Sequence, residues 1–301
     1  MNRKEQTQII RDNIPFYLTG LALILSMKYF YSRAGASQLL WLLAPTAGWV
    51  SLLSGIPFEY VHDIGYVNHG MKIIIAPSCS GMQFMLITAA MLIFSFVHLS
   101  GSLFRQSPRA EASKTVRNDY SAKQDRTDKL PACGCPGRNT SPSQGLALST
   151  HPIFLKGFAW LCFSLLLSCP FTIFVNGLRI ITAIYLPLLF ERLCLFGGSL
   201  TPDSLHTAIG TLVYFAALLT LYRLTANLFH RKTEISLFRR CLPPVFWYFA
   251  IVLGIPFLNR AYERNGEQFT GFAVLVSSCC GGILLLYCAG LLLWKLRRTG
   301  R

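Results

Sequence analysis

Residues 82–102 read MQFMLITAAMLIFSFVHLSGS and contain no Lys, Arg, Asp or Glu. At about 1.5 Å per helical residue, this stretch is long enough to cross the roughly 30 Å hydrocarbon layer of a membrane. Its backbone groups would find no water there, so the segment is expected to be an α-helix. A small polar sequence, APSCSG at 76–81, precedes it directly. The stretch therefore predicts a transmembrane helix that begins at a polar motif.

Further apolar runs recur along the chain, at 14–32, 37–54, 153–175, 206–226, 243–259 and 272–294. Of the 301 residues, 52% are hydrophobic and only 14% are charged, against roughly 25% charged in an ordinary soluble domain. This composition excludes a soluble globule, a disordered chain and a small disulfide scaffold. We therefore expect an all-α integral membrane protein, a multi-spanning bundle of about 6–8 transmembrane helices.

The charges between these runs predict which side of the membrane each loop occupies. The net charge is +15, from 28 Lys and Arg against 13 Asp and Glu. These cations lie mainly between apolar runs and at the chain ends, where they set topology and meet lipid headgroups rather than nucleic acid. The positive-inside rule places 103–152, 223–242 and the C-terminus in the cytoplasm. The less basic intervals then lie on the outer face, at 55–81, 176–205 and 260–271.

Two points of topology stay open or need a choice. If the runs at 14–32 and 37–54 both span, the N-terminus lies outside, whereas it lies inside if one of them is interfacial. Residues 180–190 (IITAIYLPLLF) are apolar but short, and they contain Pro187. A re-entrant or interfacial segment keeps the basic stretch 223–242 on the cytoplasmic side, whereas a full span would not, so we favour it there. Because re-entrant backbone is tolerated only against protein or a wet cavity, it implies an outward-facing cavity.

We expect five segments along the chain: N-terminal spans at 1–54, an outer loop and Cys-motif helix at 55–102, a basic, disordered cytoplasmic linker at 103–152, the Arg- and His-motif spans at 153–226, and a basic loop with a C-terminal span pair at 227–301. The linker is rich in Ser, Arg, Lys, Asp and Pro, which is typical of disorder. Its Cys133 and Cys135 form a lone C-x-C, a weak metal signal. The ten cysteines give neither a disulfide ladder nor a paired C-x-x-C zinc framework.

The signatures H-E-x-x-H, G-x-S-x-G and G-x-x-x-x-G-K-[ST] are missing, so chemistry must lie in the polar motifs at the ends of the apolar runs. The first motif is A-P-S-C-S-G-M, with Cys79 just before the run at 82–102. The unpaired N–H groups of a helix N-terminus favour a thiolate. Ser78 or Ser80 can cap the helix, and Gly81 would let a substrate backbone come close. Taken alone, Cys79 is more simply a packing residue.

Two further motifs fall in intervals assigned to the same outer face. V-N-G-L-R-I carries Asn176 and Arg179, which lie on one face of a helix. An arginine near the bilayer normally faces a cavity and a partner, although it can also snorkel to the headgroups. L-H-T-A-I-G carries His206, a candidate general base near neutral pH, with Gly210 four residues on to make room for a neighbour. An interfacial histidine with no role is the alternative.

A nucleophilic Cys, a His that takes its proton and a cation for the oxyanion are the parts of an acyl-transfer thiol enzyme. The predicted topology brings Cys79, His206 and Arg179 to one face. Other residues compete for these roles: His62 and His69 as the base, Asp203 and Asp63 as residues that orient an imidazole, and Cys279 as the thiol. Cys279 lies several residues inside its apolar run with no His or Arg nearby in sequence.

At these three motifs the sequence resembles the exosortase/archaeosortase family of integral-membrane, transpeptidase-like cysteine enzymes. The family pattern is a C-[SA]-G helix start, then N-x-x-R, then a His that opens a helix. Here these are Cys-Ser-Gly at 79–81, Asn176 to Arg179, and His206 with Gly210. The S-C-S-G-M-Q-F form is similar to the exosortase K subtype. The resemblance covers about residues 55–226, and it does not extend to the long 103–152 linker or to the spans at 243–294.

The resemblance implies a multi-pass protein of the cytoplasmic membrane with its active site on the extracytoplasmic face. Its substrates would be secreted proteins with a C-terminal motif, a transmembrane helix and a basic tail, of which PEP-CTERM is the known type. Cys79 would attack the peptide carbonyl, Arg179 would hold the oxyanion and His206 would move the proton. The acyl-enzyme would pass to an unknown acceptor amine or to water, and no metal or organic cofactor would be needed.

Two other functions compete with this one. A lipid- or glycan-linked acyltransferase would use the same Cys79, and its thioester would carry a fatty chain instead of a peptide. A transporter or assembly protein would use Arg179 and His206 to line a passage, and it would tolerate loss of the thiol.

Overall fold

The computed structural model describes residues 14–104, 151–192, 201–229 and 237–299. Most of these residues are helical, and six helical segments are long and apolar enough to cross a membrane. They are α2 (Ile14–Arg33), α4 (Met82–Phe104), α6 (His151–Arg192), α7 (Pro202–Phe229), the continuous run of α8 (Leu237–Phe249), η2 (Ala250–Gly254) and α9 (Ile255–Leu258), and α11 (Gly266–Thr299). The fold is that of a multi-pass helical membrane protein, as the composition predicted.

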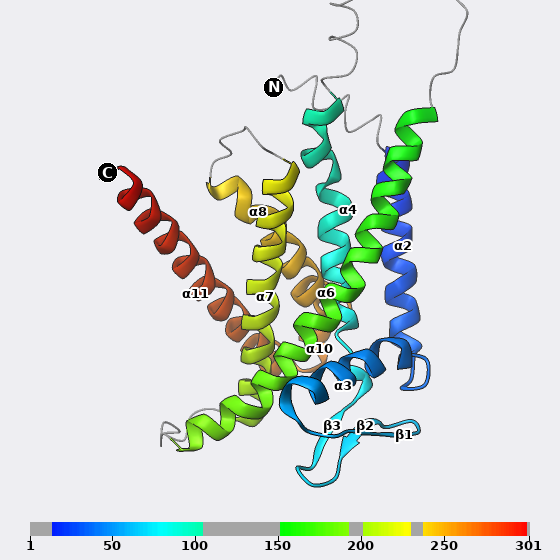
Figure 1. The fold of residues 1–301 in the computed structure, drawn as a ribbon, viewed down its shortest axis with the longest axis vertical. Coiled ribbons are helices and arrows are strands. Elements are labelled where there is room, and N and C mark those ends of the chain that lie inside the picture. The colour runs from blue at the N-terminus through cyan, green and yellow to red at the C-terminus, as the bar shows by residue number, and fades with distance from the viewer. Residues whose placement is uncertain (1–13, 105–150, 193–200, 230–236, 300–301) are drawn as a thin grey trace, which may run out of the picture.

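Helix α3 (Leu40–Ser54) answers the question left by the first two apolar runs. It has 15 residues, which at about 1.5 Å each give roughly 22 Å, short of the hydrocarbon layer. It ends at Gly55, whose positive φ of 71° closes the helix by a bond from its N–H to the Ser51 carbonyl. In Figure 1 α3 lies across the lower end of the bundle instead of along it. Of the two runs, only α2 has the length of a span.

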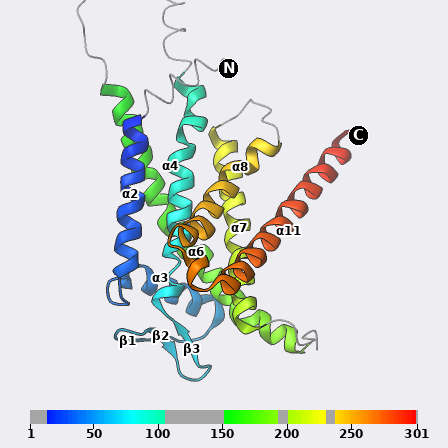
Figure 2. The same ribbon diagram turned by 180° about the vertical axis from the view of Figure 1, so that it is seen from behind.

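The six long helices alternate in direction (Figures 1 and 2). Helices α2, α6 and α8 begin at the upper end in Figure 1, and α4, α7 and α11 begin at the lower end. The start of α2 and the end of α11 therefore share one end of the bundle. The end of α4 and the start of α6, which flank the basic segment 105–150, lie at that same end. Residues 105–150, with Cys133 and Cys135, lie outside the described residues.

The lower end of the bundle carries a small antiparallel sheet that the sequence did not predict. Strands β1 (Glu59–Val61), β2 (Gly65–Asn68) and β3 (Ile73–Ile75) pair in the order β1-β2-β3. The register places Tyr66 of β2 opposite Tyr60 on one side and Ile75 on the other. Buried Ile75 joins the core formed by α3, and β3 leads into the 3₁₀ turn η1 (Pro77–Cys79). The sheet thus fixes the approach of the chain to Cys79.

Helix α6 corrects the expectation for residues 180–190. These residues are neither a re-entrant loop nor a separate segment, because α6 continues through them as a single 42-residue helix despite Pro170 and Pro187. Neighbouring protein compensates for the backbone bonds that proline removes in a membrane helix. The apolar face at Ile180 packs with Leu42 and Leu43 of α3. Residues 180–190 therefore provide no non-helical backbone that would require a cavity, although the same end of the bundle does hold one.

Helix α4 is the centre of the bundle. In its apolar segment 78% of the residues are buried, against 11% in the corresponding segments of α2 and α11. It contacts α2, α6, α7 and α8, and the side chains of Phe84 and Leu86 are almost completely buried. The motif that contains Cys79 therefore leads directly into the most enclosed helix of the described residues.

Candidate active site

The segment that carries Cys79 is a short turn joined to α4. Pro77 opens η1, the Cys79 N–H bonds the Ala76 carbonyl at 2.8 Å, and the Ser80 N–H bonds the Pro77 carbonyl at 3.1 Å. The hydroxyl of fully buried Ser80 accepts the Met82 N–H at 3.4 Å, so Ser80 rather than Ser78 satisfies one of the free N–H groups at the start of α4. The thiol of Cys79 is free and half-buried.

Gly81 is required by its backbone and by its neighbours. Its φ is +77°, a conformation that costs residues with a Cβ roughly 1–2 kcal/mol. A Cβ there would lie 2.9 Å from Cγ of Asn176 and 3.0 Å from Cγ2 of Thr172. The expectation that Gly81 leaves space for a substrate backbone is therefore wrong. The space is taken by α6, which approaches the Cys79 turn through this glycine.

Asn176 ties α6 and α7 to the turn. Its Nδ2 donates to the Cys79 carbonyl at 2.7 Å, and its Oδ1 accepts the Tyr214 hydroxyl at 2.6 Å. The side chain is completely buried, so these bonds use a donor and an acceptor that would otherwise be unsatisfied. Asn176 therefore holds the backbone of the residue whose thiol is the candidate nucleophile.

Arg179 and His206 are in direct contact. Arg179 Nη2 lies 2.6 Å from His206 Nε2. A guanidinium only donates, so Nε2 must be the acceptor, and a neutral ring then carries its proton on Nδ1. The Cys79 thiol lies within hydrogen-bonding reach of His206, and the charge of Arg179 acts on it. The structure thus brings together the three residues that the sequence proposed, from η1, α6 and α7.

Arg179 is an almost buried cation, with only 9% of its surface exposed. Its Cζ lies 5.4 Å from the centre of the Tyr214 ring, within range of a cation–π contact. Its buried Nε has no hydrogen-bond partner among the described residues. A Cβ on Gly210 would lie 3.1 Å from this Nε. The neighbour for which Gly210 makes room is therefore Arg179.

The competing residues lie elsewhere. His62 Nε2 lies 3.5 Å from Asp63 Oδ2, and both side chains are 77% exposed at the turn between β1 and β2. His69 is exposed at the turn between β2 and β3. Cys279 lies within α11 beside buried Cys280. Of the described histidines, His206 is the one that contacts Arg179 and lies within hydrogen-bonding reach of Cys79.

Tyr214 is the site residue that the sequence analysis missed. Besides its bond to Asn176, its ring stacks on Phe84 of α4 with centroids 4.4 Å apart and planes 9° apart. The signal was present, because Tyr214 follows His206 and Gly210 at four-residue intervals and so shares their face of α7. Extending that face by one turn would have found it.

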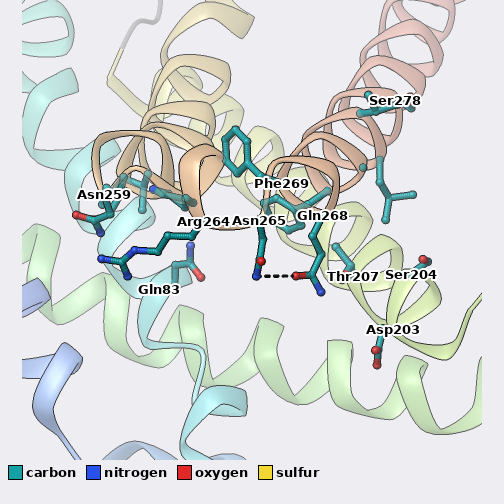
Figure 3. Close-up of a pocket in the computed structure, with 18 of the residues that line it drawn as sticks. Gln83, Asp203, Ser204, Thr207, Asn259, Arg264, Asn265, Gln268, Phe269 and Ser278 are labelled. Atoms are coloured by element: carbon teal, nitrogen blue, oxygen red, sulfur yellow. Dashed lines mark hydrogen bonds between the residues drawn. The ribbon is translucent and has the colours of Figure 1, made fainter.

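A partly open cavity of about 1210 Å³ adjoins these residues (Figure 3). Cys79, Arg179 and His206 are not among its described lining residues, but Thr207, which follows His206, and Gln83, four residues after Cys79, are. Asp203, an expected partner of an imidazole, lines the cavity one turn before His206, whose ring contacts Arg179 instead. In the described part of the chain no three His, Cys, Asp or Glu side chains gather as metal ligands.

Comparison of the chain with protein-family models, with curated proteins and with solved structures found no match. We therefore infer a function from the geometry of the site.

Proposed function

We propose that this protein is a membrane-embedded cysteine protease or transpeptidase of the exosortase/archaeosortase type. It would cleave the C-terminal sorting tail of secreted proteins, for processing or anchoring at the cell surface. The observation that supports this is the meeting of Cys79, His206 and Arg179 from three separate elements at one end of the bundle. By the positive-inside rule that end is extracytoplasmic, because it lies opposite the ends that flank the basic segment 105–150.

The reaction begins with the thiol. Cys79 Sγ attacks the carbonyl carbon of the scissile peptide bond while its proton passes to Nε2 of His206, which gives up its hydrogen bond from Arg179 as it accepts the proton. The carbonyl oxygen becomes an oxyanion, which the guanidinium of Arg179 stabilises. The protonated ring then gives its proton to the leaving nitrogen, the C–N bond breaks, and the tail departs as an amine. A thioester of the substrate on Cys79 remains.

The contact between Arg179 and His206 is broken during this step. Once protonated on Nε2, the ring has two donors and no acceptor for Arg179. The 2.6 Å bond between Nη2 and Nε2 is then lost, and two positive groups face each other. The guanidinium is therefore released from the ring as the oxyanion forms, and the oxyanion takes the place of the lost acceptor.

The second half returns the enzyme to its starting state. An acceptor amine or water attacks the thioester carbonyl, and neutral His206 takes the proton of the attacking group. Arg179 again faces the oxyanion. The C–S bond then breaks, and His206 returns its proton to the Cys79 sulfur. Transfer to an amine gives an anchored product, and transfer to water gives a free carboxylate.

The test is co-expression with a secreted reporter that carries a C-terminal motif, transmembrane helix and basic tail from the same genome. Wild type should shorten the reporter, and Cys79→Ala should not. Cys279→Ala is the matched control, because it removes another half-buried thiol and should leave processing unchanged. A conjugate of enzyme and reporter that neutral hydroxylamine releases should form only when Cys79 is present.

Equal shortening by wild type and Cys79→Ala would remove Cys79 as the nucleophile. A transporter would instead retain its function in Cys79→Ala and lose it in Arg179→Ala. A conjugate that carries a fatty chain in place of the peptide would favour the acyltransferase.

A further inference from the structure

The cavity beside the site has one wall that the proposed chemistry does not use. This wall is formed by α9, the short helix α10 (Ala261–Arg264) and the first three turns of α11. The opposite side is formed by α2, α4 and the start of α7. Cavity and thiol are close, since Gln83 lies four residues after Cys79 and Tyr31, another lining residue, is within electrostatic reach of that thiol.

The cavity is lined by polar and apolar side chains, and three of its lining residues are charged, namely Lys28, Asp203 and Arg264. In Figure 3 Gln83 of α4 projects toward the pair formed by Asn265 and Gln268 at the start of α11. Asn265 Nδ2 donates to Gln268 Oε1 at 3.3 Å. All three amide side chains belong to exposed residues. Other parts of the wall are apolar side chains such as Leu86, Ile251 and Phe272.

Uncharged amides facing one another across a cavity are suited to a peptide backbone. Each carries one acceptor and two donor hydrogens, so it satisfies both the C=O and the N–H of a chain. A thiol reaches a carbonyl carbon only where the substrate is not helical, because a helix covers its own carbonyls with side chains and hydrogen bonds. At membrane depth such an unwound segment must bond to protein or to water in a cavity.

We propose that this cavity binds an extended peptide segment of a membrane-anchored substrate, with Gln83, Asn265 and Gln268 as its backbone-binding residues. The inference rests on the proposed function, and it supplies the peptide-holding part of that site. The apolar part of the lining receives hydrophobic side chains where the substrate's own membrane helix begins. Helices α9 to α11 thereby gain a role: they form the wall against which the segment is held in reach of Cys79.

Kinetics give the first test. The double variant Asn265→Ala/Gln268→Ala in the full-length protein should raise KM for the tailed reporter on the order of ten-fold and leave kcat within about two-fold, because it removes ground-state hydrogen bonds. Thr270→Ala is the control. Its hydroxyl bonds the Gly266 carbonyl of its own helix, it is not among the described cavity residues, and it should leave both constants unchanged.

Photo-crosslinking gives the second test and separates this inference from the proposed function. A benzoylphenylalanine at position 268 in a Cys79→Ala background should crosslink the intact reporter tail, whereas one at Leu286, which is 76% exposed on α11, should not. One outcome would overturn the cavity inference and leave the proposed function standing. In it, wild type processes the reporter, position 268 gives no crosslink, and the double variant has the wild-type KM. If position 268 crosslinks but wild type does not process, the proposed function fails and the binding site stands.

Discussion

Replacing Gly210 with alanine should separate stability from activity. A Cβ at this position would lie 3.1 Å from Nε of Arg179 and 3.7 Å from its Nη2. The 3.1 Å separation from Nε is closer than an ordinary van der Waals contact, so the guanidinium must move by a few tenths of an ångström. The same group lies 2.6 Å from His206 Nε2, and the movement disturbs that contact directly. The α7 backbone itself is helical here and accepts alanine without strain.

Two effects of opposite sign follow. Alanine is favoured over glycine in a helix interior by roughly 1 kcal/mol, so the fold should lose little stability or gain some. A displacement of about 1 Å in a catalytic group costs on the order of a hundred-fold in rate, so a few tenths should cost about ten-fold. We therefore expect Gly210→Ala to accumulate in the membrane like wild type and to process the tailed reporter about ten-fold more slowly.

The assay is the initial rate of reporter shortening in isolated membranes, beside a thermal unfolding curve of the purified protein in detergent. Gly281→Ala on α11 is the matched control, because a Cβ there meets no atom within 4 Å and gains the same helix propensity. If Gly210→Ala folds well and processes the reporter at the wild-type rate, the reasoning is refuted, because the position of Arg179 would then not limit the reaction. Loss of folded protein would show that the Arg179 side chain cannot move aside for the added methyl group.

Three further predictions follow from the same geometry. Tyr214→Phe removes the hydroxyl that bonds Asn176 but keeps the ring under Arg179, so kcat should fall by about three- to ten-fold with KM unchanged; an altered KM alone would contradict a positioning role. Gly177→Ala would drive a Cβ into the Trp49 ring, so the protein should unfold several degrees lower in a thermal melt, and an unchanged melting temperature would show that α3 moves freely. Because the proposed steps use only side chains, processing should persist in a metal chelator, and loss restored by added metal would contradict them.

The sequence predicted the long helices and the gathering of the three site residues for one physical reason. Membrane depth forces apolar runs into helices, and loop charge assigns each helix end to a side. Cys79 and His206 lie near such an end, and the expected span at 153–175 put Arg179 near one too, although α6 continues from Arg179 to Arg192. Sidedness alone therefore assigned the three residues to one face. Their contact was not implied by sidedness, and it required the close packing that Gly81 and Gly210 permit.

What the sequence did not predict depends on contacts between segments. The strands of the sheet have only three or four residues each. That is too short for an alternating pattern of apolar and polar residues to distinguish a strand from a loop. Within residues 180–190, α6 packs on α3 at Ile180 and Ile184 and bonds it at Tyr185, contacts that hydropathy does not report. Asn265 and Gln268 were expected only as part of the outer interval 260–271, because nothing in the local sequence indicates that α11 begins beside a cavity that Gln83 also lines. The division into five segments stays a prediction.

The burial of α4 has a consequence for how the protein is made. A chain enters the membrane from its N-terminus, so α2 and α4 are inserted before α6, α7 and α8 have been synthesised. Until those partners arrive, Thr88 and Ser95, both buried in the finished protein, are exposed to lipid or to the insertion machinery. The turn that carries Cys79 has no Asn176 to hold it during that interval. The Cys79 thiol is therefore in place before the side chains of α6 and α7 that surround it, and the proposed activity would require α7 to have been inserted.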